Sequence, residues 1–425
     1  MNFRVPLLLG SGILAALFWA GAPASAQRGN MFQGSADDPA ITYMTGAVSN
    51  VVDSLNTRLA AGDVRLSFQG RSGYLRSLLA ALDVGTDAQM LVYSPTSLQA
   101  PRINERNPRA LFFNDHVEVG WVRGGDVLEL AAQDATRGIV FYTLEQKDTD
   151  TPRFKRVTTC LGCHMTGDTL GVPGLLMFST TLDADRRIDT QTFIDHRLRV
   201  ESRFGGWFVT GNSGPAQHKG NAVAALDGRP SHALATTDGL YDADGYPATS
   251  SDVASLMVFS HQVQMTNLLI RAGWEARALD PTLHPDTSQE AAATVLRGVA
   301  AEVADYILFV DEAPLQGPMQ GRTGFAERFS TGGPRDKAGR SLRELDLNRR
   351  LMRYPCSYLI YAPMFDALPR SVKDPIYERL WRILSGAERD PRYRSAFTLA
   401  DRRAVVEILR DTKPDLPTYF KPVTR

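Results

Sequence analysis

The hydrophobic positions of the chain follow a helical period at first and then break into short runs. Between residues 47 and 61 apolar side chains recur every three or four positions, which predicts a helix. A second, shorter helix is predicted over residues 74–82. The runs that follow are rich in β-branched and aromatic residues, as strands are. They cover residues 90–93, 110–113, 117–122, 127–130 and 138–142.

A glycine-rich break separates two of these runs. Gly124, Gly125 and Asp126 stand where a hairpin turn would join consecutive strands. The pattern therefore predicts a small, mainly antiparallel sheet in the first half of the chain.

From about residue 250 onward the pattern becomes helical. Ser251 and Asp252 are suited to cap a long helix that ends near residue 279. Further helices are predicted over residues 287–310, 342–351, 372–385 and 400–411, with a linker rich in Gly, Pro and Arg over 313–340. The expected fold class is α+β, with the sheet followed by a mostly α-helical C-terminal region.

Residues 1–26 have the three parts of a signal peptide. A short basic start at Arg4 precedes an apolar run over residues 5–20, and Ala24-Ser25-Ala26 forms a small-x-small cleavage site. The mature protein is then expected to begin at Gln27 and to be periplasmic. The alternative is an uncleaved N-terminal anchor. No later segment has 18 uninterrupted apolar residues, so no transmembrane span is expected after cleavage.

The composition and net charge of the chain indicate which kinds of partner to expect. The chain has 425 residues, of which 43% are hydrophobic and 22% charged, as in globular proteins. The formal net charge is zero, so neither nucleic acid nor an anionic membrane surface is indicated as a partner. We expect two regions after the signal peptide, an α+β region over 27–245 and an α-helical region over 246–425.

The most specific motif is Cys160-Leu161-Gly162-Cys163-His164, the attachment signature of a c-type haem. Each thiol adds to one haem vinyl group, so the two sulfurs must lie about one tight turn apart. The adjacent His164 can then supply an imidazole nitrogen as the fifth iron ligand. A zinc ribbon would need a second ligand pair, and a thioredoxin-like pair does not require the histidine. The third cysteine, Cys356, lies in an apolar run and is expected to be buried and unreactive.

The sixth iron ligand is not determined by this pattern. His261 is expected in mid-helix on a buried face, and His218 lies in a loop that could reach the iron. His196 could pair with a propionate or act as a distal acid–base group. Methionine is the other common ligand; the candidates are Met177, Met257 and Met265. His261 or His218 is our preferred candidate.

Residues 160–164 resemble the haem site of c-type cytochromes. A wider pattern is similar to a family of exported bacterial proteins described as cytochrome c domain-containing. The matching pieces are residues 113–115, 119–121, 205–211, 218–221, 261–262 and 353–358. This resemblance implies covalent haem binding and electron transfer.

The expected function is that of a periplasmic mono-haem c-type cytochrome that exchanges electrons with redox partner proteins. The sheet would lie next to the haem loop, and the helical region 246–425 would close over the haem. The alternative is a haem-dependent oxidoreductase or peroxidase with an open or weakly held sixth iron position. A haem-based sensor is a third possibility. The oligomeric state is not predicted.

Overall fold

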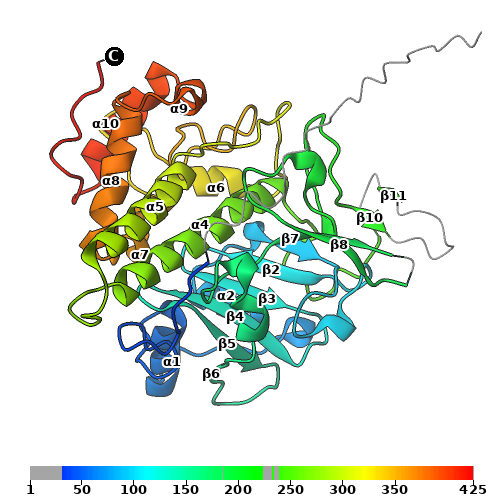
Figure 1. Cartoon of the computed structure of the whole chain (residues 1–425). Coiled ribbons are helices and arrows are strands. Elements are labelled where there is room, and N and C mark those ends of the chain that lie inside the picture. The colour runs from blue at the N-terminus through cyan, green and yellow to red at the C-terminus, as the bar shows by residue number, and fades with distance from the viewer. Residues whose placement is uncertain (1–30, 184, 224–231, 234–238, 425) are drawn as a thin grey trace, which may run out of the picture.

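The computed structural model describes residues 31–183, 185–223, 232–233 and 239–424 (Figure 1). The predicted signal peptide, residues 1–26, lies outside the described residues. Within them the expected α+β fold class is confirmed, because an antiparallel sheet occupies the N-terminal half and helices predominate after it.

The sheet has seven antiparallel strands in the order β6-β5-β4-β3-β2-β1-β9. The strands are β1 (Met90–Val92), β2 (Arg109–Phe113), β3 (Val117–Trp121), β4 (Val127–Asp134), β5 (Gly138–Glu145), β6 (Phe154–Arg156) and β9 (Trp207–Phe208). All five predicted runs are strands, and Gly124 and Gly125 lie in the β3–β4 connection. The sequence did not predict β6 and β9. Strand β6 has one apolar residue, Phe154, and β9 has only two residues, so neither forms a recognisable apolar or alternating run.

The two faces of the sheet differ in what covers them. Strand β4 alternates along its whole length, with Leu128 and Leu130 buried on one face and Glu129 and Ala131 half-buried on the other. We call the first the outer face; it packs on the predicted helices, observed as α1 (Val51–Ala61) and α2 (Leu75–Ala81). The second, the inner face, is turned toward helix α4.

Helix α4 (Val253–Ala278) lies between the inner face and the other C-terminal helices (Figure 1). It begins as predicted, with the Asp252 carboxylate accepting hydrogen bonds from the amides of Ala254 and Ser255. Phe259 packs on Phe113 of β2, and on the opposite side α4 packs on α5 (Gln289–Ile307), which in turn packs on α8 (Arg370–Leu384). Because it has neighbours all round, α4 buries polar as well as apolar side chains.

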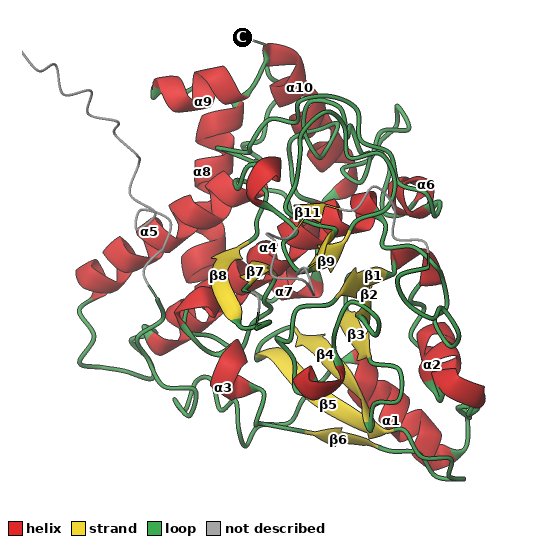
Figure 2. Cartoon of the chain, turned by 90° about the vertical axis from the view of Figure 1, so that its right-hand side faces the viewer, coloured by secondary structure: helices red, strands yellow, loops and turns green. Residues whose placement is uncertain are grey.

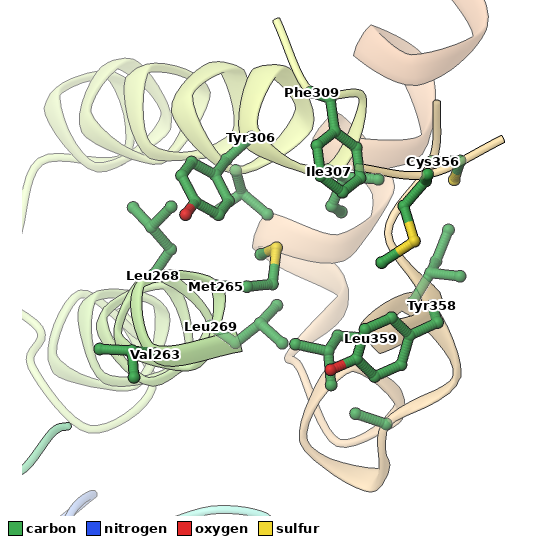
Figure 3. Packing of buried hydrophobic residues seen from close by; sticks show 14 of the residues in the cluster. Val263, Met265, Leu268, Leu269, Tyr306, Ile307, Phe309, Cys356, Tyr358 and Leu359 are labelled. Atoms are coloured by element: carbon green, nitrogen blue, oxygen red, sulfur yellow. The ribbon is translucent and has the colours of Figure 1, made fainter. Parts of the chain in front are cut away.

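Buried side chains from α4 and α5 meet those of the segment around Cys356 (Figure 3). Met265 and Leu269 of α4, Phe309 after α5 and Leu359 belong to one hydrophobic cluster, which includes residues from Phe32 to Val423. Both predicted regions therefore contribute to the same core.

The remaining helices of the C-terminal half are α6 (Phe325–Thr331), α7 (Pro363–Asp366), α9 (Pro391–Ala396) and α10 (Leu399–Thr412). Helix α10 confirms the helix predicted over 400–411, whereas α6, α7 and α9 were not predicted. The helix predicted over 342–351 is wrong. Asp346 there accepts hydrogen bonds from the amides of Asn348 and Arg349, and Leu347 has φ of 52°, so the chain turns instead. The predicted linker 313–340 contains α6.

A hairpin of β7 (Phe178–Leu182) and β8 (Ile188–Phe193) was not predicted. Strand β8 is exposed along nearly its whole length, so it has no apolar alternation to reveal it. Strands β10 (Ala222–Val223) and β11 (His232–Ala233) form a second small pair. No helix among the described residues is both long and apolar enough to cross a membrane.

Candidate functional site

The Cys160–His164 motif forms a single helical turn, α3 (Leu161–His164), after β6 (Figure 2). The amide of His164 donates to the Cys160 carbonyl at 2.9 Å. Cys160 and Cys163 are three residues apart in this turn, so their side chains project from the same face. Cys160 is half-buried and Cys163 exposed, and none of the three cysteines, all of them described, is in a disulfide. Burial raises the pKa of the Cys160 thiol. Both sulfurs are therefore free for covalent chemistry.

His164 is held in one tautomer. Its Nδ1 lies 2.9 Å from the Gly174 carbonyl oxygen, which can only accept, so Nδ1 carries the proton. The lone pair is then on Nε2. Burial lowers the pKa of His164, which keeps the ring neutral at pH 7. The Phe141 ring packs on the imidazole at a centroid distance of 4.8 Å. This is the state in which an imidazole binds a metal.

The partner of His164 is itself held in place by helix α4. The Leu175 amide donates to Asn267 Oδ1 at 2.8 Å, and Asn267 Nδ2 donates to the Leu175 carbonyl at 2.9 Å. A Cβ on Gly174 would lie only 2.4 Å from Asn267 Oδ1, so the close approach requires glycine. Asn267 thereby fixes the loop that orients the His164 ring.

An ion pair lies on the inner face of the sheet near the turn. Arg109 of β2 reaches Glu129 of β4, and its guanidinium crosses β3 above Gly120. A Cβ on Gly120 would lie 2.4 Å from Arg109 Nη2, so only glycine leaves room for this path. The pair is close enough to act on the motif, since Arg109 contributes to lowering the pKa of His164 and Glu129 to raising that of Cys160.

His261 has other partners in this structure. It is fully buried in α4, its Nδ1 lies 2.8 Å from His196 Nδ1, and its Nε2 lies 2.7 Å from Ser357 Oγ. Burial lowers its pKa to about 3. On the helix it is six residues from Asn267, about 9 Å along the axis. Both ring nitrogens are engaged, so iron binding would require one of these hydrogen bonds to break.

His218 is half-buried in its loop, and its ring packs edge-on against Phe204. Its Nδ1 accepts a hydrogen bond from the Gly220 amide at 3.0 Å. A neutral ring that accepts at Nδ1 carries its proton on Nε2. Metal binding through Nε2 would therefore cost the Gly220 hydrogen bond.

The methionine candidates lie in the hydrophobic core. Met177 and Met265 are buried, and Met257 accepts a contact from Arg203 Nη1 at 3.3 Å through its sulfur. Cys356 is buried as expected, and burial raises the pKa of its thiol.

A surface cavity of about 580 Å³ lies elsewhere, at the outer face of the sheet. Its lining includes Phe68, Trp121, Arg71 and Arg123, and both arginines are already paired with Asp242. This cavity includes none of the motif residues.

The residues that orient the site were not found from the sequence. None of these residues belongs to a recognisable sequence motif; they are Gly174, Asn267, Arg109 and Gly120. Only Asn267 could have been noticed in the sequence, because it is a polar residue on a helix that was expected to be buried. Over the described part of the chain, no group of three or more His, Cys, Asp or Glu side chains is arranged to hold a metal ion.

Comparison with known proteins gave no match to a protein-family model, a curated protein or a solved structure. The assignment of a function therefore depends on the chemistry of α3, two free thiols and a neutral imidazole with one available nitrogen.

Proposed function

We propose that the protein is an exported mono-haem c-type cytochrome that transfers electrons in the bacterial periplasm. The observation that carries this proposal is the geometry of α3, in which Nδ1 of His164 is bound to the Gly174 carbonyl and both thiols are free. Covalently bound haem supplies one-electron redox chemistry at its iron.

The residues present fit such a group. Cys160 and Cys163, on one face of the turn, would hold the porphyrin through two thioether bonds. Nε2 of His164 would be the fifth iron ligand, with its ring fixed through Gly174. A neutral histidine needs no deprotonation before it binds a metal, and burial keeps His164 neutral.

His261 and His218 remain the candidates for the sixth ligand. Each would have to give up a hydrogen bond. That observation favours a second function, a haem-dependent oxidoreductase or peroxidase whose sixth position is open or weakly held.

Residues 1–26 support export, and redox proteins of the periplasm are the proposed partners. Cell fractionation and N-terminal sequencing test this part. A mature N-terminus at Gln27 in the periplasmic fraction is expected, and an intact N-terminus in the membrane fraction would contradict it.

The central test is the mass of the mature full-length protein made together with a cytochrome c maturation system. We expect the mass of one haem to be retained after denaturation, and Cys160→Ser with Cys163→Ser to lose it. Cys356→Ser is the matched control, because it removes a thiol outside the motif and should leave the covalent haem in place. A wild-type protein without covalent haem would overturn the proposal.

Visible spectra separate the two functions. In an electron carrier with two strong axial ligands, the haem iron is low-spin and does not bind added cyanide or carbon monoxide. An iron with an open sixth position binds both. Loss of the low-spin spectrum in His261→Ala, but not in His218→Ala, would identify His261 as the ligand, and the reverse result would identify His218.

A further inference from the structure

Part of the inner face of the sheet is incompletely covered, although it belongs to central strands. Leu111 of β2 and Glu129 and Ala131 of β4 are half-buried, while their neighbours Phe112 and Leu130 on the outer face are buried. Helix α4 covers the adjoining part of the inner face, where Phe259 meets Phe113. This partly exposed patch therefore lies beside α4.

This patch adjoins the cysteine turn. Phe141 of β5, whose ring packs on His164, is in register with Ala131. Val157, in the segment that leads to α3, donates its amide to the Phe141 carbonyl at 2.9 Å. Partly buried apolar side chains of the same segment, Val157 and Leu161, pack against the core there. An apolar surface beside two free thiols is suited to a flat apolar ligand.

Arg109 places a cation on this patch with hydrogen-bonding capacity to spare. Its Nη2 is paired with Glu129, which also accepts from Ser97 Oγ and Gln99 Nε2. Its Nε is buried and has no hydrogen-bond partner among the described residues. The Arg109 side chain is 20% exposed, so part of it can meet a ligand that arrives from outside, and a guanidinium is a strong partner for a carboxylate.

We infer that the inner face of β2–β4 beside α3 is the platform on which the porphyrin lies, and that Arg109, held across β3 by Glu129, binds one of its propionates. This inference rests on the proposed function, and it adds the orientation of the ligand and the residue that recognises its carboxylate.

The test uses the holoprotein with its covalent haem, so that attachment does not depend on Arg109. In Arg109→Gln the propionate band of the resonance Raman spectrum should shift, because a hydrogen bond is lost. The midpoint potential should fall, because removal of a nearby positive charge favours the oxidised iron. In Arg109→Lys the midpoint potential should fall less than in Arg109→Gln, because lysine keeps the positive charge but lacks the paired N–H donors of the guanidinium.

Gly120→Ala tests the geometry without removing any charge. Its Cβ would displace the Arg109 guanidinium, so the same shift of the propionate band is expected although the arginine is present. The control is Arg102→Gln, which removes an arginine paired with Asp126 at the surface and should change neither readout.

An unchanged propionate band in Arg109→Gln, with covalent haem retained, would overturn this inference and leave the proposed function standing. A wild-type protein that carries no covalent haem would overturn both.

Discussion

Asn267 is a polar residue inside a buried helix, and its two hydrogen bonds to Leu175 explain its presence there. Through them α4 fixes the Gly174 carbonyl, and Gly174 in turn fixes the His164 ring. The cysteine turn is short and partly exposed, so by itself it could not hold the imidazole in one orientation. The orientation of the His164 ring is therefore set by a helix about 100 residues further along the chain.

Asn267→Leu should lower the free energy of unfolding by about 3 kcal/mol, because it leaves the amide and carbonyl of Leu175 buried without partners. Urea denaturation measures this. Gln264→Leu on the same helix is the matched control. Its Oε1 is buried with no partner in the described part of the chain, so its replacement should cost less than about 1 kcal/mol. Equal losses in the two variants would show that the Leu175 contacts contribute nothing specific.

At the residue scale, the cysteine–histidine motif could be recognised from the sequence, but the residues that orient it could not. Cys160, Cys163 and His164 are adjacent in sequence, and their spacing implies their chemistry. The Gly174 and Asn267 contacts join segments that only the tertiary fold brings together. The same holds for His261, whose mid-helix, buried position was predicted but whose partners His196 and Ser357 were not.

At the scale of elements, α4 organises the molecule, and its N-terminus does more than cap a helix. The buried Asp252 carboxylate accepts from the amides of Ala254 and Ser255 and also from those of Arg322 and Thr323. One side chain therefore both starts the helix and attaches the segment before α6 to it.

Asp252→Ala should lower the free energy of unfolding by about 3–4 kcal/mol, because four amides lose their acceptor in a buried site. This is more than the effect of losing an ordinary N-cap. Ser288→Ala is the matched control. Ser288, exposed at the start of α5, accepts one hydrogen bond from the Ala291 amide through its Oγ, so its loss should lower the free energy of unfolding by about 1 kcal/mol or less. Chemical denaturation of both variants gives the comparison, and a cost for Asp252→Ala within the ordinary range would contradict the attachment role.

The elements that the sequence predicted well are those with a strong period or a capping residue, such as α4, α8 and the strands β1–β5. The failures have local causes. The segment over residues 342–351 has helical apolar spacing, but Asp346 binds the amides that follow it and stops a helix from forming. The hairpin β7–β8 lies at the surface, where burial imposes no pattern on its side chains.

At the scale of the whole molecule, one core connects the sheet and the helices, and it contains ionisable groups with displaced pKa values. Burial raises the pKa of Glu118, on the inner face of β3, to about 8. Its Oε1 accepts from Gln262 Nε2 at 3.3 Å, and its Oε2 has no partner among the described residues. Burial likewise raises the pKa of Glu312 to about 7. Both carboxyls are partly or mostly protonated in the folded protein at pH 7, whereas they are ionised in the unfolded chain.

These carboxyls predict how stability depends on pH. Between the ordinary value of 4.5 and about 8, the folded state holds a proton on Glu118 that the unfolded state has released, so the unfolded state binds fewer protons. The free energy of unfolding therefore falls as pH rises through this window, by up to about 1.4 kcal/mol per pH unit from Glu118. The contribution is fully present below pH 4.5.

Glu118→Gln removes this titration while it preserves the size of the side chain, so its stability should fall less steeply between pH 5 and 8 than that of the wild type. The difference between the two free energies of unfolding, measured by urea denaturation across this range, isolates Glu118 from the other titrating groups. Glu145→Gln serves as control. Glu145 is exposed, and the contact with Lys155 lowers its pKa rather than raising it, so Glu145 should not make the free energy of unfolding fall as pH rises from 5 to 8. If the wild type and Glu118→Gln had parallel profiles, Glu118 would be ionised in the folded protein, and the inner face of β3 would have to be open to water.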